Sequence, residues 1–318
     1  MEFGISTQSR GLYTTRATYM AVAQAAEAAG FSFLAVNDHI IVPGTLGTAY
    51  PYTQGGAWSA SEHGHCFDQL ATLAFLAGCT SRLKLLTSVM VVPHRPVIQT
   101  AKTLSTIDVL SSGRLILGVG AGWMPEEFRL LGAPFAERGA ATDEYLEAFR
   151  QLWTADRPSY KGRHVNFDDL IFAPKPLQPG GPPIWVGGES PAAMRRTVKL
   201  GTGWYPGNNN QKMLMDTPAR LKTGIAKLHG VAEKAGRDPA SIDLGLIIQN
   251  PFEWTAQRTQ DNSARRLFTG TSADMRADLA ALEAVGVRHV ALRLGGDTVT
   301  ESLERMQRFG EEVITAGR

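Results

Sequence analysis

The chain has 318 residues, 43% of them hydrophobic and 19% charged, which is enough for a large core in one or two domains. A net charge of +2 argues against nucleic-acid and membrane-surface proteins, and no apolar run approaches the roughly 20 residues of a membrane span. The N-terminus has no secretory pattern, and Cys66 and Cys79 form no CxxC motif, so we expect a reducing, cytoplasmic setting.

Seven short apolar runs predict β-strands, and a weak eighth lies between the fifth and the sixth. The strong runs cover residues 2–6, 32–36, 83–92, 115–120, 183–187, 242–248 and 289–294, and the weak one covers 203–205. Helical periodicity lies between them, over residues 15–29, 67–80, 96–111, 137–153, 191–200, 218–235, 272–285 and 298–316. Ser190 before Pro191, and Thr271 three residues before Asp274, are signals of a helix N-terminus.

Strands that alternate with helices predict a parallel sheet, here in a single α/β domain over residues 1–318. The number of elements favours a closed (β/α)8 TIM-like barrel, with an open doubly wound sheet as the alternative. Three segments interrupt the repeat, at about 41–66, 157–183 and 206–218, and the second contains SYKGRHVNF, which is typical of a small β-hairpin. We expect all three to follow strands, at the C-terminal face where barrels place their active sites.

The fourth apolar run ends in three glycines, Gly118, Gly120 and Gly122. A dinucleotide-binding turn needs G-x-G-x-x-G after the first strand, so both the spacing and the position argue against it. The glycines either let the strand end in a tight turn or allow a flat ring system to lie against the backbone. A helix is predicted to begin at Pro125, with Glu126 and Glu127 in its first turn.

The residues around these glycines resemble the bacterial luciferase-like monooxygenase family, most of all its deazaflavin-dependent oxidoreductase branch. The resemblance covers almost the whole chain. Its motifs are NDH at 37–39, FDQLATLAFLAGCTSRLKLLTSVMVVPHRP at 67–96, SSGRLILGVGAGWMPEEFRLLG at 111–132 and PPIWVGGESPAAMRR at 182–196. The resemblance implies a TIM-like barrel that carries coenzyme F420, or alternatively FMN, at the C-terminal face, usually in a homodimer.

The resemblance also implies where such a cofactor lies. Family members often have a bulge with a non-prolyl cis peptide at the end of the third strand, here Ser88, Val89 and Met90, and Ser88–Val89 is the candidate bond; an ordinary strand end is the alternative. Gly120, Ala121 and Gly122 form a second wall. Luciferase-type members that bind riboflavin phosphate tend to carry an arginine at the position of Ala121, and its absence favours the deazaflavin.

A phosphate site is predicted at residues 187–190, Gly187, Gly188, Glu189 and Ser190, which precede a helix. Backbone amides at a helix N-terminus bind anions, although a structural Ser N-cap explains the same residues.

Asp38 and His39 end the second strand, and in the deazaflavin branch this pair borders the ring and the reacting centre. His39 is the candidate catalytic residue, because imidazole exchanges protons near neutral pH; the alternative is a hydrogen-bonded structural histidine. Trp123 stands where the branch's sugar-phosphate dehydrogenases have an acidic residue. This departure argues against that activity and suggests an apolar or aromatic wall, with core packing as the alternative.

Two further signals are weaker. EHGHC places His63, His65 and Cys66 together, but the sequence has no second cluster with ligand spacing, so we predict no metal site. Basic helices expected over 212–234 and 258–266 are interpreted as solvated faces, from which a few charges could meet the deazaflavin's polyglutamate tail.

These observations predict an oxidoreductase that transfers a hydride between coenzyme F420 and a small organic substrate. The alternative within the family is an FMNH2-dependent monooxygenase served by a separate flavin reductase. An alternative of another class is a non-catalytic flavin-binding protein. The sequence does not identify the substrate.

Overall fold

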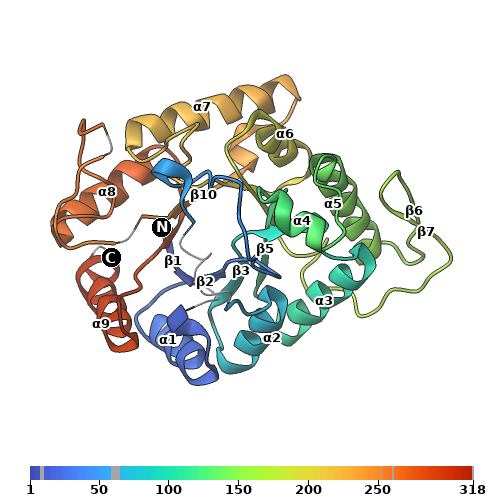
Figure 1. The fold of residues 1–318 in the computed structure, drawn as a ribbon, viewed down its shortest axis with the longest axis horizontal. Helices are drawn as coiled ribbons and strands as arrows, with labels where there is room; N and C mark the ends of the chain where they lie inside the picture. The colour runs from blue at the N-terminus through green and yellow to red at the C-terminus, as the bar shows by residue number, and fades with distance from the viewer. Residues whose placement is uncertain (8–10, 59–64, 251, 260, 317–318) are drawn as a thin grey trace.

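The computed structural model describes residues 1–7, 11–58, 65–250, 252–259 and 261–316. Among these residues, eight parallel strands close into a barrel at the centre of the molecule (Figure 1). The ring runs β3-β2-β1-β11-β10-β9-β8-β5, and pairing of β3 with β5 closes it. The predicted barrel is therefore confirmed, including its weak eighth strand, and the open sheet is excluded.

The barrel strands and a short continuation have the following bounds: β1 (Glu2–Thr7), β2 (Phe33–Val36), β3 (Lys84–Thr87), β4 (Met90–Val91), β5 (Leu115–Gly120), β8 (Ile184–Gly187), β9 (Gly203–Tyr205), β10 (Asp243–Ile248) and β11 (His289–Leu292). β4 follows β3 after a two-residue interruption and pairs with the end of β5. Side chains that face the barrel interior fill it as a packed core. They belong to Phe33, Ala35, Leu86, Ile116, Trp185, Tyr205 and Ala291.

Helices surround the barrel and cover the outer faces of its strands (Figure 1). They are α1 (Arg16–Ala28), α2 (Gln69–Cys79), α3 (Val97–Leu110), α4 (Pro125–Leu130), α5 (Arg138–Thr154), α6 (Pro191–Leu200), α7 (Pro218–Lys234), α8 (Ser272–Ala284) and α9 (Val299–Phe309). The predicted caps are confirmed: Ser190 accepts from the Ala193 amide, and Thr271 forms a capping box with Asp274. No helix of the described ranges is long and apolar enough to cross a membrane.

One predicted basic helix is wrong. The segment 258–266 is a loop in which Arg258 and Arg265 form an antiparallel bridge, so there is no basic helix there in its described part. Arg265 instead pairs with Asp278 of α8, which fixes the loop against the barrel wall.

The insertions at 41–66 and 206–218 follow β2 and β9, at the C-terminal ends of the strands as predicted. The insertion at 157–183 does not, because it connects α5 to the start of β8. It forms the predicted hairpin, β6 (Tyr160–Lys161) with β7 (Asn166–Phe167), which lies outside α5 and α3 (Figure 1). Gln178 of this insertion donates to the carbonyl of Leu115, at the N-terminal end of β5. Only the first and third insertions can therefore contribute to a site at the C-terminal face.

Candidate active site

A cavity of about 1020 Å³ opens at the C-terminal ends of the barrel strands. It is lined by residues from the strand ends and by the loops at 46–58 and 207–210. All but one of the predicted site residues line it: Asp38, His39, Ser88, Val89, Gly120, Ala121, Gly122, Gly187, Gly188, Glu189 and Ser190. The exception is Met90, whose side chain is fully buried in the core between barrel and helices. Since side chains alternate along a strand, Met90 points away from the cavity that Val89 faces.

The end of β3 carries the backbone feature that the resemblance implied, since the Ser88–Val89 peptide bond is cis. Val89 then lies above the ends of β5 and β8. A Cβ atom added to Gly120 would come within 2.7 Å of the Val89 side chain, and one added to Gly187 within 2.9 Å. The two glycines therefore make room for the Val89 side chain. Val89 itself lines the cavity.

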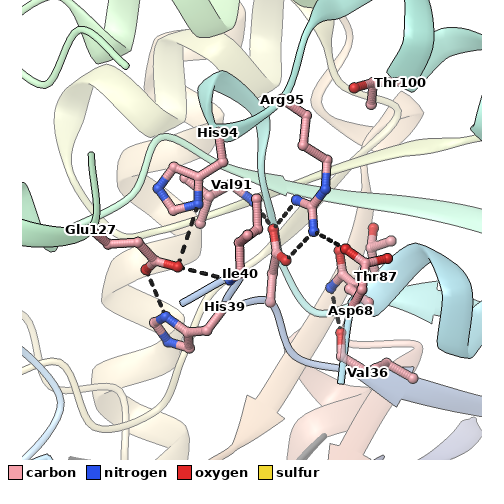
Figure 2. Close-up of polar contacts among 12 residues, drawn as sticks. Val36, His39, Ile40, Asp68, Thr87, Val91, His94, Arg95, Thr100 and Glu127 are labelled. Carbon is pink, nitrogen blue, oxygen red and sulfur yellow. Dashed lines mark hydrogen bonds and ion pairs between the residues drawn. The ribbon is translucent and has the colours of Figure 1, made fainter. Parts of the chain in front are cut away.

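His39 is held at the edge of the cavity by a carboxylate behind it. Its Nδ1 lies 2.8 Å from Oε2 of Glu127, on the first turn of α4 (Figure 2). Glu127 Oε1 accepts from the amides of Ile40 and Ile41, at 2.8 and 3.3 Å. A carboxylate can only accept, so Nδ1 of His39 carries the proton and Nε2 is left for the cavity.

The charge of Glu127 is stabilised although its side chain is 1% exposed. Burial raises the pKa of Glu127, but the hydrogen bond from His39, the two neighbouring imidazoles and the Ile40 amide outweigh it and hold the pKa below its usual value. The second imidazole is that of His94, whose Nδ1 lies 3.9 Å from Glu127 (Figure 2). Burial lowers the pKa of His94, and the nearby carboxylates of Glu127 and Asp38 oppose this effect.

Asp38 lies beside His39, and protein groups hold its carboxylate. Arg95 donates to both of its carboxylate oxygens at 2.8 Å, and the Val91 amide donates at 2.9 Å. Its side chain is 0% exposed. Burial raises the pKa of Asp38, but the Arg95 guanidinium overcomes this and lowers it. Asp38 therefore ties the segment after β2 to β4 and to Arg95, next to His39 in the chain.

The predicted phosphate site lies at the N-terminus of the ten-residue helix α6. Gly188 has a φ of 95°, and Ala192 and Ala193 of the first turn line the cavity together with Arg138 and Arg196. Helix amides and two guanidinium groups thus surround one end of the cavity.

The carboxylate of Glu189 is held by donors of the neighbouring loops. It accepts from the Gly207 amide at 2.7 Å, from Asn210 at 2.5 Å and from the Tyr52 hydroxyl at 3.3 Å. Burial raises the pKa of Glu189, and these donors oppose that effect. Its carboxylate thus links the loops after β2, β8 and β9.

The metal interpretation of EHGHC gains no support from the described part of the chain. His63 lies outside the described residues, and Cys66 donates its thiol to the His39 carbonyl at 3.2 Å. No group of three metal-ligating side chains occurs within the described ranges.

The family model for luciferase-like monooxygenases matches residues 1–294. The chain belongs to this family. An uncharacterized protein of Mycobacterium tuberculosis is 34% identical over 253 residues, 79% of this chain and 84% of that protein. An FMNH2-dependent dimethylsulfone monooxygenase of Pseudomonas fluorescens is 31% identical over 229 residues, 71% of this chain and 54% of that protein. The coenzyme F420-dependent tetrahydromethanopterin reductase of Methanopyrus kandleri has the same fold, with a TM-score of 0.77, 17% identity and coverage of 100% and 99%.

An aromatic wall closes one side of the cavity in this luciferase-like protein. The rings of Trp58 and Trp123 have centroids 5.8 Å apart, those of Tyr50 and Trp123 are 5.1 Å apart, and Trp58 lies 4.6 Å from His39. Trp123 thus faces the cavity as predicted. Trp58 and Tyr50 come from the insertion after β2.

Sequence reasoning missed the partners of the luciferase-like site, chiefly Glu127 and Arg95. The sequence predicts Glu127 only as an acidic residue in the first turn of a helix, where it stands next to Glu126. Arg95 carried no local signal, because its partner Asp38 lies 57 residues away in the chain.

Proposed function

We propose that this protein is an oxidoreductase that transfers a hydride between a deazaflavin, coenzyme F420, and a small organic substrate. The observation that carries the proposal is His39, fixed by Glu127 with its Nε2 left for the cavity that also holds Val89. Hydride transfer to or from a carbon that bears oxygen leaves a proton to be supplied or removed, and an imidazole so placed can do this.

The cavity fits a tricyclic cofactor with a phosphate. Val89 and the glycines of β5 and β8 provide a flat surface for a ring, and the α6 N-terminus with Arg138 and Arg196 provides an anion site at one end. Bound there, the deazaflavin supplies the ring carbon that donates or accepts the hydride. The protein's own contribution is to orient the reactants, to exclude water with the Trp58 and Trp123 wall, and to hold a proton on His39.

A second candidate is an FMNH2-dependent monooxygenase. The similarity to the dimethylsulfone monooxygenase, at 31% identity, supports it. Luciferase-type members that bind riboflavin phosphate tend to carry an arginine at the position of Ala121. The alanine found here supports the deazaflavin instead. Both candidates use the same cavity and differ in the cofactor that binds.

The test is a titration of the purified protein with oxidised F420 and, separately, with FMN, followed by quenching of cofactor fluorescence. We expect F420 to bind with a Kd in the low micromolar range, at least about tenfold more tightly than FMN. Tighter binding of FMN would select the monooxygenase. Failure of both cofactors to bind below about 1 mM would overturn both candidates. Bound cofactor without turnover of any donor or acceptor would select the non-catalytic binding protein.

A further inference from the structure

Arg293 follows β11 directly and points into the cavity. Alternate residues of β11 face the barrel interior: the His289 ring lies 4.6 Å from that of Trp185, and Ala291 packs in the interior cluster. Arg293 is the next residue in this alternation, at the C-terminal end, and it lines the cavity. The barrel geometry therefore directs a guanidinium group at whatever occupies the strand ends.

Arg293 differs from the other two arginines that line the cavity. Arg138 donates to two backbone carbonyls, and Arg196 pairs with Asp143. Among the described residues, the guanidinium of Arg293 has neither a hydrogen-bond acceptor nor a carboxylate at ion-pair distance. Its five donors are thus left for a ligand.

The surroundings of Arg293 do not compensate its charge. Among the described residues that line the cavity, two are acidic, Asp38 and Glu189. Arg95 pairs with Asp38, and donors of the neighbouring loops bind Glu189. Burial lowers the pKa of Arg293, with Tyr50 and Tyr13 opposing this effect, and a guanidinium nevertheless stays charged near neutral pH. A partly buried cation without a partner is costly, and an anionic ligand removes that cost.

Arg293 is separated from the predicted cofactor residues by the whole width of the barrel. In the ring of eight described strands, β11 stands opposite β5 and three places from β8. Val89, Gly120 and the α6 N-terminus lie on the β3, β5 and β8 side, so a phosphate bound there does not need Arg293. Arg293 faces the space that remains for a substrate.

The aromatic wall reaches the same space. Tyr50, Trp58 and Trp123 line the same cavity as Arg293. The Tyr50 ring packs against Trp123, which in turn packs against Trp58. A ligand held by Arg293 therefore has its body beside aromatic faces. An apolar, planar body suits these faces, and a carboxylate suits the planar fork of the guanidinium.

We propose that Arg293 binds the carboxylate of an aromatic carboxylic acid substrate, across the barrel mouth from the cofactor. This rests on the proposed function, since a substrate must face the cofactor. The guanidinium orients the acid through two parallel hydrogen bonds, and the wall of Tyr50, Trp58 and Trp123 holds its ring.

Benzoate tests the proposal, with benzamide as an uncharged probe of nearly the same shape. Each is titrated into the cofactor-free protein, and binding is followed by quenching of tryptophan fluorescence. We expect benzoate to bind at least about tenfold more tightly than benzamide, and Arg293→Gln to remove this difference. Arg293→Lys keeps the positive charge but loses the planar guanidinium, so it should retain part of the preference for benzoate over benzamide.

Arg288→Gln is the matched control, because Arg288 is an exposed arginine at the other end of the same strand. It should leave benzoate affinity unchanged within about twofold. The proposal is overturned if benzamide binds as tightly as benzoate, if neither binds, or if Arg293→Gln leaves benzoate affinity unchanged. A loss of F420 affinity in Arg293→Gln comparable to the loss for benzoate would also overturn it, by placing Arg293 on the cofactor. The benzoate titration uses no cofactor, so its outcome is independent of whether F420 binds.

Discussion

The buried ion pair of Asp38 with Arg95 lies beside the site, and we expect its loss to lower the stability of the fold. We predict that Asp38→Asn lowers the free energy of unfolding by about 3–5 kcal/mol at neutral pH, because Arg95 loses its buried counter-ion. Asp68→Asn is the control. Asp68 contacts the same guanidinium but is 46% exposed, so we expect a loss below about 1 kcal/mol. Urea denaturation measures both, and equal losses would contradict the account.

The same pair also predicts a dependence on pH. The pKa of Asp38 is lower in the folded protein than in the unfolded chain, so its stabilisation is complete above the unfolded value of about 3.9 and is lost as pH falls through the folded one. The difference in unfolding free energy between the wild type and Asp38→Asn should therefore narrow below about pH 4. A constant difference between pH 3 and 7 would show that the carboxylate is not charged in the folded state.

His39 gives the prediction about activity. His39→Gln should lower kcat by about 100-fold or more while leaving the Kd of the cofactor within about twofold, because proton transfer is lost but the ring surface is not. Glu127→Gln should lower kcat less, since the amide still accepts from Nδ1 without its charge. Steady-state rates and cofactor titrations on the same preparations separate the two effects. An unchanged kcat in His39→Gln would leave His39 with a structural role.

At the scale of the elements, the end of β5 leaves no space for side chains. A Cβ atom on Gly118 would lie 2.0 Å from the Thr87 backbone oxygen of β3. We therefore predict that Gly118→Ala destabilises the protein by at least about 3 kcal/mol, because two paired strands must separate. Gly78→Ala is the opposite control. Gly78 lies exposed in α2 with nothing within 4 Å of its added Cβ, and we expect a gain of about 0.5–1 kcal/mol in thermal or urea unfolding. An unfolding free energy for Gly118→Ala equal to that of the wild type would contradict the close packing of β3 against β5.

The elements also show what the sequence could and could not predict. Strand and helix positions followed from periodicity, because each barrel strand is buried on both faces and each helix on one. The place of 157–183 was misjudged because loop composition does not reveal whether a loop precedes or follows a strand. Glu127 and Arg95 were missed for another reason: their partners lie 88 and 57 residues away, and only barrel closure brings them together.

At the scale of the whole molecule, loops from distant strands form one cover over the cavity. Tyr52 donates its hydroxyl to Glu189, and Asn209 donates to the Tyr52 carbonyl. We predict that Tyr52→Phe speeds hydrogen exchange of the Tyr50 amide, which bonds to the Gly56 carbonyl, by about fivefold, the equivalent of one lost hydrogen bond. Tyr145→Phe on α5 should leave this exchange unchanged. Equal exchange in the wild type and Tyr52→Phe would mean that the two loops close independently.

The central claim is that a deazaflavin binds across β3, β5 and β8 with its phosphate at the N-terminus of α6. A crystal structure of the protein with F420 tests this most directly. The account predicts the ring against Val89, the phosphate beside Gly188 and Ser190, and Arg293 free of the cofactor. A cofactor whose phosphate contacts Arg293, or whose ring lies away from Val89, would contradict it.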